Sequence, residues 1–416
     1  MPKNIKCNGI NSELINWLRG YKHLESILPD INDFETDLIP AICDKDHRKR
    51  VAHSKEVIKI LWYNHPVLGP YPFLETLSDF EFDRQFYQGY RDHASHQLKV
   101  YFLGLYFFEK SPLINKAIID ELQISNNKEA IREFHLRWLI TAVYHDIGYV
   151  IENEQTNELD EKVWDKTKKV LNETLHTPLC YLPKFGKTLS REREEQIIQN
   201  NGIFYPTVKH PVDIEKDKSC RDLLNLISED AIKANLGIVT ENVSSPLRSY
   251  YEFAYKTKAK DGRPKFRDHG IASSLLLLKV WRSFNDYIEQ LCLLTNEELL
   301  KSSLSEILAL KSSLKGFDKT IYAAAGAISL HNLNKDIWDE SEAIKHHLTL
   351  KEYWLRLENN NGNKATPLAF LLGLVDSIQC WDRPMYNNPT TKDKQITDED
   401  IEMSYVDGNV ILRVAS

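Results

Sequence analysis

The chain lacks the cysteine patterns that mark cysteine-bound zinc sites and disulfide-rich proteins. Its 416 residues include six cysteines, and none of them forms a CxxC pair. Scattered thiols of this kind are typical of reduced, cytosolic proteins, and their spacing argues against both classes of site. We therefore expect free thiols at all six positions, which are Cys7, Cys43, Cys180, Cys220, Cys292 and Cys380.

Long apolar runs and a strong charge of one sign are also absent. The longest apolar runs, such as residues 275–278, are far shorter than the roughly 20 residues of a membrane-spanning helix. The N-terminal stretch has no apolar segment typical of a signal peptide. The net charge of −7 argues against a strongly basic protein that wraps nucleic acid, and the 42% hydrophobic content excludes a disordered chain. We expect a cytoplasmic protein with no membrane partner.

Glycine and proline number only 16 each, and helical spacing of apolar residues recurs through the chain. Thr366 before Pro367 predicts a helix start, with threonine as the N-cap and proline in the first turn. Asp407-Gly408 lies between two alternating apolar runs in 403–414, which predicts a β-hairpin. The fold class is therefore all-α with a small C-terminal β-hairpin. The helices are expected in 11–28, 95–108, 131–144, 271–294, 319–330 and 367–380.

The length allows two or three domains, or one large domain with an insertion. Residues 151–265 are largely polar or turn-rich, and we interpret them as a large insertion with some helix in 219–256. We therefore divide the chain into five parts: an N-terminal helical region in 1–90, a first core part in 91–150, the insertion in 151–265, a second core part in 266–395 and the hairpin in 396–416.

Histidine and aspartate recur in or beside the apolar helical segments. His145-Asp146 closes one such segment, although about one His-Asp pair is expected by chance in a chain of this composition. Asp376 lies in the middle of a strongly apolar helix, where an unpaired carboxylate would be costly. Imidazoles and carboxylates together suit divalent first-row metals. The candidate metal ligands are His96, His145, Asp146, His269, His331 and Asp376.

Each of these residues also has an ordinary structural interpretation. His96 could be a satisfied core histidine, His269 a surface histidine on a helix capped by Asp268, and His331 a histidine at the negative end of a helix dipole. Among the other histidines, His135 lies in a buried helix without an acidic neighbour and is assigned to the core. The histidines in polar stretches are assigned no role: His176, His210, His346 and His347.

The order His, His-Asp, His, His, Asp resembles the HD superfamily of metal-dependent phosphohydrolases, which is named for its adjacent His-Asp pair on an all-helical core. The resemblance rests on His96, on HDIG at 145–148 and on Asp376, and it covers 91–150 and 266–385. His269 and His331 resemble the extra histidines of the two-metal branch, which includes HD-GYP phosphodiesterases and CRISPR-type HD nucleases. Tyr149 stands where many relatives have lysine, no GYP triplet follows, and the gap between Asp146 and His269 is longer than usual.

The resemblance implies an HD-type core and two divalent ions bridged by Asp146, which would be the catalytic carboxylate. The ions would be Mn²⁺, Fe²⁺, Co²⁺ or Ni²⁺, with Mg²⁺ or Zn²⁺ as alternatives. The expected function is hydrolysis of a nucleotide phosphate ester or phosphodiester by a metal-activated hydroxide. Four further residues are candidates for contacting the substrate phosphate or for orienting the metal ligands: His93, Asp268, Gln379 and Arg383. Arg383 could instead form an ordinary surface salt bridge.

Two other functions stay open at this point. One is a nuclease acting on single-stranded nucleic acid, for which the basic stretch 256–268 could line a groove. The other is a catalytically silent HD module that senses a nucleotide. The expected partner is a nucleotide or phosphodiester substrate, with nucleic acid and a homo-oligomer left open.

Overall fold

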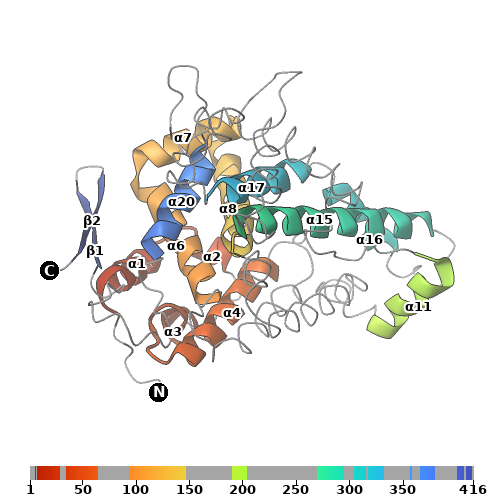
Figure 1. Cartoon of the computed structure of the whole chain (residues 1–416), viewed down its shortest axis with the longest axis horizontal. Helices are drawn as coiled ribbons and strands as arrows, with labels where there is room; N and C mark the ends of the chain where they lie inside the picture. The colour runs from red at the N-terminus through yellow and green to blue at the C-terminus, as the bar shows by residue number, and fades with distance from the viewer. Residues whose placement is uncertain are drawn as a thin grey trace, which may run out of the picture.

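The computed structural model describes about half of the chain. The described residues are 5, 7–28, 34–63, 94–146, 190–203, 269–294, 304–314, 317–331, 357, 366–379, 401–406 and 409–414. In these residues the protein is mostly helical, with one antiparallel hairpin near the C-terminal end (Figure 1). The helical fold class and the C-terminal hairpin are confirmed.

The N-terminal elements are α1 (Gly9–Arg19), α2 (Leu24–Ile27), the π-helix η1 (Phe34–Leu38), α3 (Ile39–Cys43) and α4 (His47–Tyr63). The following elements are α6 (Ala94–Lys110), α7 (Pro112–Leu122), α8 (Asn127–Tyr144), α11 (Arg191–Asn201), α15 (His269–Leu293), α16 (Leu304–Leu314), α17 (Asp318–Leu330) and α20 (Pro367–Gln379), and the strands are β1 (Ile401–Val406) and β2 (Asn409–Val414). Helices α6, α8, α15, α17 and α20 occupy segments expected from apolar spacing, whereas α3, α4, α7, α11 and α16 were not among the helices expected from the sequence.

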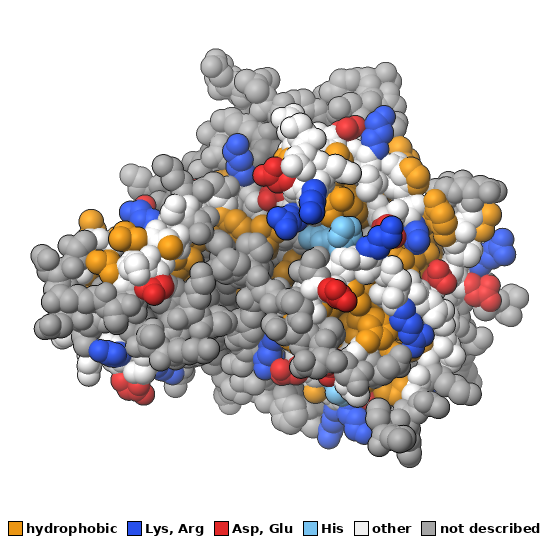
Figure 2. Space-filling view, turned by 180° about the vertical axis from the view of Figure 1, so that it is seen from behind, with side chains coloured by type: hydrophobic (Ala, Val, Ile, Leu, Met, Phe, Trp, Pro, Cys, Tyr) orange, Lys and Arg blue, Asp and Glu red, His pale blue; other side chains and the backbone are white. Residues whose placement is uncertain are grey.

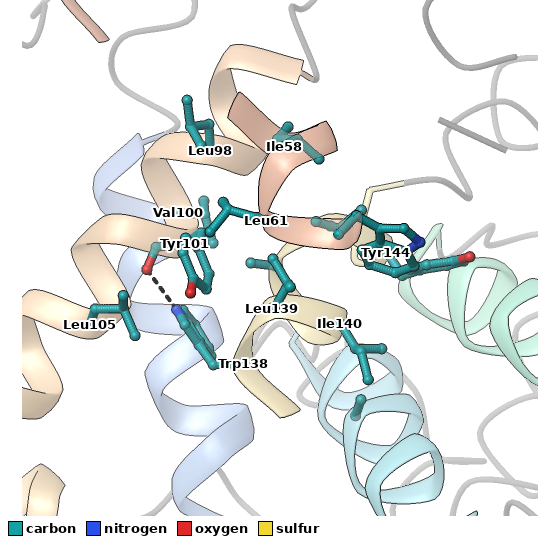
Figure 3. Packing of buried hydrophobic residues seen from close by; sticks show 14 of the residues in the cluster. Ile58, Leu61, Leu98, Val100, Tyr101, Leu105, Trp138, Leu139, Ile140 and Tyr144 are labelled. Atoms are coloured by element: carbon teal, nitrogen blue, oxygen red, sulfur yellow. Dashed lines mark hydrogen bonds between the residues drawn. The ribbon is translucent and has the colours of Figure 1, made fainter. Parts of the chain in front are cut away.

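Helix α6 runs through the centre of the molecule. All residues from Ala94 to Phe108 are buried, as expected for a helix that is apolar on nearly every face. It packs against α4, α8 and α20, and Figure 3 shows how its side chains meet those of α4 and α8. The Trp138 indole N–H donates to the carbonyl of Tyr101 over 2.8 Å. A Cβ atom at Gly104 would lie 2.0 Å from the Trp138 ring, so glycine permits this close approach.

Helix ends are set by local capping residues. The Ser111 hydroxyl accepts from the amide of Ile114 at the start of α7, and the Asn126 side chain accepts from two amides at the start of α8. The expected start of α20 is confirmed at Pro367, because the carbonyl of Thr366 accepts the first helical hydrogen bond from Phe370 over 2.8 Å. The expected 11–28 helix is instead two helices, because the chain turns between Arg19 and Leu24.

The C-terminal hairpin has the expected position. Strand β1 pairs with β2 from Ile401 opposite Val414 to Val406 opposite Asn409, which leaves Asp407-Gly408 as the connection. Ile401 and Met403 are buried, and β1 packs against α1. The hairpin therefore covers the N-terminal helix at the edge of the helical body (Figure 1).

Cysteines 7 and 43 contradict the expectation of free thiols, because they form a disulfide. The two residues are 36 positions apart and are brought together when the segment before α1 meets the end of α3. Cys292 is free. The remaining cysteines, Cys180, Cys220 and Cys380, lie outside the described residues.

Most of the expected insertion lies outside the described residues, including 219–256 and the basic stretch 256–268. Its described part forms α11, whose first turn is capped by the Ser190 hydroxyl. Glu194 of this helix is buried and accepts a hydrogen bond from the hydroxyl of Tyr287 on α15. The domain boundaries are not tested by these contacts.

The described surface mixes both signs of charge. On the face drawn in Figure 2, basic and acidic side chains alternate around exposed hydrophobic atoms. The described helices include none that is long and apolar enough to cross a membrane.

Candidate metal centre

Five helices each contribute to one cluster of histidine and aspartate side chains. His96 lies in the first turn of α6, and His145 and Asp146 follow directly after α8. His269 is the first residue of α15, His331 follows the last residue of α17, and Asp376 lies within α20. The structure therefore brings together all six residues that the sequence pattern singled out, although they span 281 positions (96 to 376, counted inclusively).

The first group consists of His96, His145, Asp146 and Asp376, whose ligand atoms all lie within 4.8 Å of one another. The two imidazole Nε2 atoms are 3.1 Å apart. His96 Nε2 lies 3.3 Å from an oxygen of Asp146 and 3.0 Å from an oxygen of Asp376. His145 Nε2 lies 3.3 Å and 3.6 Å from the same two carboxylates.

These spacings match the edges of a coordination shell. Two ligand atoms about 2.1 Å from one cation lie about 3.0 Å apart at a right angle and about 3.4 Å apart at the tetrahedral angle. The two imidazole Nε2 atoms lie 3.1 Å from each other and 3.0 to 3.6 Å from the carboxylate oxygens of the first group. Two imidazole nitrogens and two carboxylates are also a donor set that suits divalent first-row metals. The residues therefore fit a metal ion in both spacing and chemistry.

The second group consists of Asp146, His269 and His331. His269 Nε2 lies 3.5 Å from an oxygen of Asp146, and the His331 ring stands edge-on to both the His269 and the His145 rings. The Nε2 atom of His331 is buried and has no hydrogen-bond partner within the described part of the chain. Because Asp146 belongs to both groups, its carboxylate can bridge two cations.

Backbone carbonyls set the direction of two of the imidazoles. His145 Nδ1 donates to the carbonyl of Ala142 over 2.8 Å, and His331 Nδ1 donates to the carbonyl of Ile328 over 2.5 Å. A ring that donates through Nδ1 has its lone pair on Nε2 when it is neutral. Both rings therefore present Nε2 as the ligand atom, which is the arrangement that carbonyl partners impose on metal-binding histidines.

Small residues at the start of α15 bring the two halves of the cluster together. The Ser273 hydroxyl donates to the carbonyl of His145 over 2.7 Å, and the Ser274 hydroxyl donates to the carbonyl of Ala325 over 2.8 Å. A Cβ atom at Gly270 would lie 2.6 Å from the Ile328 carbonyl and 2.9 Å from the His331 ring. The hydrogen bond from Ser273 to His145 had no signal in the sequence.

The carboxylates and imidazoles shift each other's pKa values. Burial favours a raised pKa for Asp376, but hydrogen bonds from His145 and His96 outweigh it and hold that pKa well below its usual range. Burial favours a lowered pKa for His145, but the charges of Asp146 and Asp376 raise it. Burial and the neighbouring His269 lower the pKa of His331 to about 4, which keeps that ring neutral.

The cluster is largely enclosed. His145 and Asp146 are fully enclosed, whereas the side chains of His269 and Asp376 are 8% and 15% exposed. Asp376 is therefore the most exposed ligand of the first group. Burial of this degree strengthens electrostatic interactions inside the cluster.

The other sequence-based assignments have mixed outcomes. The core role of His135 is confirmed, because it is buried and bonded to the hydroxyl of Tyr21. Gln379 is buried at the end of α20, one helical turn after Asp376. The remaining residues lie outside the described part of the chain: His93, Asp268, Arg383, His176, His210, His346 and His347.

Comparisons with known proteins found no matching family model, no matching curated protein and no matching solved structure. The functional assignment therefore rests on the residues of the cluster, which form a buried pair of potential metal sites with one shared aspartate.

Proposed function

We propose that this protein is a metal-dependent phosphohydrolase of the HD type that hydrolyses a phosphate ester or phosphodiester of a nucleotide. The observation that carries the proposal is the sharing of Asp146 between two groups of potential metal ligands. Two-metal sites with a common carboxylate are characteristic of phosphoryl-transfer chemistry, in which paired cations stabilise the attacking and leaving oxygens. The HD resemblance of the sequence supports the same class.

The protein's own residues would hold the reacting groups in place. His96, His145 and Asp376 complete one side of the cluster, and His269 and His331 complete the other. Bound divalent cations would supply Lewis acidity that activates water and neutralises phosphoryl oxygens. Asp146 joins the two sides, which makes it the residue with the greatest expected effect on both metal binding and turnover. The buried histidines and the surrounding helices limit the access of bulk water.

Replacement of Asp146 by asparagine tests the proposal. The substitution keeps the size of the side chain and removes the charge that both groups share. We expect the protein to lose most of its bound Mn²⁺ and its metal-dependent activity to fall at least about 100-fold. Metal content is measured by mass spectrometry, and activity is measured with bis-p-nitrophenyl phosphate, cyclic dinucleotides and labelled single-stranded oligonucleotides.

The matched control is Asp120→Asn, which changes an exposed aspartate on α7 that lies outside the cluster. This variant should keep wild-type metal content and activity. Turnover of oligonucleotides but not of nucleotides would favour the nuclease alternative. Metal binding without turnover of any substrate would favour a sensing module, and wild-type activity in Asp146→Asn would rule out the proposed site.

A further inference from the structure

Gln379 is a buried polar residue that the cluster itself leaves unexplained. It is the last residue of α20 and is only 2% exposed. Its side-chain nitrogen, Nε2, is buried and has no hydrogen-bond partner among the residues that the structure describes. An amide nitrogen carries two N–H donors, and a buried donor left unsatisfied is energetically costly. Buried orphan donors are rare in native proteins and call for a physical explanation.

The helix places this amide beside the candidate metal centre. Gln379 follows Asp376 by three positions, and residues three apart on a helix are neighbours on the same face. Asp376 is the ligand with the greater exposure in the first group, at 15%. Gln379 therefore lies one helical turn from the most exposed ligand of the first group.

We infer that the Gln379 side chain donates a hydrogen bond to an oxygen of a phosphoryl group bound at the metal centre. This inference rests on the proposed function and adds a substrate-contacting residue to it. A neutral amide suits the role, because it offers donors to an anionic oxygen without competing with the histidines for the cations. The phosphoryl oxygen would satisfy the donor that the protein leaves open.

Two substitutions separate this role from a purely structural one. Gln379→Leu keeps the approximate volume and removes both donors. Because it removes an unsatisfied buried group, it should leave the melting temperature of the metal-free protein unchanged or raised. The matched control is Gln97→Leu on α6, where Gln97 is also 2% exposed and its Nε2 also lacks a partner. Gln97 is next to the candidate ligand His96 in sequence. Because adjacent helical residues point in different directions, the Gln97 side chain is not expected to face the metal centre with His96.

The experiment measures binding of inorganic phosphate to the Mn²⁺-loaded full chain by calorimetry, together with the melting temperature of the metal-free protein. We expect wild type and Gln97→Leu to bind phosphate alike, and Gln379→Leu to bind it about tenfold more weakly or worse with unchanged metal content. Equal phosphate affinity in Gln379→Leu would overturn the inference. So would a lowered melting temperature of that metal-free variant, since this would indicate a structural hydrogen bond.

The outcomes also distinguish the inference from the proposed function. A wild-type protein that binds Mn²⁺ but not phosphate overturns the role of Gln379 and leaves the metal centre standing. A wild-type protein that binds no metal overturns the proposed function and the inference with it.

Discussion

Single histidines in this protein differ in what their ring nitrogens face. In the cluster, the Nε2 atoms of His96 and His145 point at each other and at carboxylates. His135 also lies on a buried helix, but its Nε2 accepts a hydrogen bond from the hydroxyl of Tyr21 over 2.8 Å. Burial raises the pKa of Tyr21, so this hydroxyl keeps its proton. The partner of the ring, rather than its burial, separates a candidate ligand from a core histidine.

His135 should make the stability of the fold depend on pH. Burial and the nearby His23 lower its pKa from 6.5 to about 4, so the native ring is neutral where the unfolded ring is protonated. The unfolded chain therefore binds more protons, and stability falls as the pH drops from 6.5 to about 4. The expected loss is about 3 kcal/mol. Urea unfolding at several pH values measures it.

The variant His135→Gln should flatten this pH dependence within the same window, because glutamine has no proton to gain. The control is His53→Gln, at a partly exposed histidine on α4. An identical slope in wild type and His135→Gln would show that another group causes the acid sensitivity.

At the scale of the helices, the cluster forms where helix ends converge. His145 and His331 stand at the C-terminal ends of α8 and α17. The carbonyl ends of helices carry partial negative charge, which favours a bound cation. His269 begins α15 and His96 lies in the first turn of α6. The close packing of α15 against α17 then decides whether the second group of ligands is complete.

Gly270→Ala should damage the second group selectively. The added Cβ would meet the Ile328 carbonyl at 2.6 Å and the His331 ring at 2.9 Å, so α17 or the His331 ring must move. We expect the bound metal to fall from two ions toward one, because the first group does not depend on His331. Mass spectrometry of the metal-loaded protein measures the stoichiometry.

Gly20→Ala is the control for this prediction, because a Cβ there would meet its nearest atom, the Trp17 carbonyl, at an ordinary 3.6 Å. It should retain two ions. Full metal content in Gly270→Ala would mean that the packing of α15 on α17 tolerates the methyl group, and that glycine is not required there.

For the whole molecule, the N-terminal elements are tied to the helical body at several points. Helices α1, α3 and α4 pack against α6, and β1 of the hairpin covers α1. The disulfide between Cys7 and Cys43 closes a loop that contains α1, α2 and η1. The packing contacts hold only the native fold together, whereas the disulfide also restricts the unfolded chain.

Removal of this disulfide should destabilise the fold without emptying the metal centre. A cross-link over 36 residues restricts the unfolded chain and typically contributes 2–4 kcal/mol, so Cys7→Ser should lower the free energy of unfolding by roughly that amount. Denaturant titration measures the change, and metal content should stay at the wild-type level. Cys292→Ser removes the described free thiol and serves as the control. Equal stability in Cys7→Ser would contradict the expected contribution of the cross-link.

Much of the fold was predictable because helix and hairpin signals are local. The apolar periodicity placed α6, α8, α15, α17 and α20 within a few residues, and Asp407-Gly408 marked the hairpin connection. The six candidate ligands were also identified from their apolar surroundings, since a charged or polar group in such a helix needs a partner.

What the sequence alone determined is the position of the five helices around the cluster and the identity of the six side chains that need partners. Only the tertiary structure decided which partners they have: His96 meets Asp376 across 280 positions, and Cys7 meets Cys43 across 36. It likewise decided that Glu194, in a polar stretch, is buried against Tyr287. The physical reason is that periodicity depends on neighbours a few residues away, whereas these contacts depend on how whole helices pack.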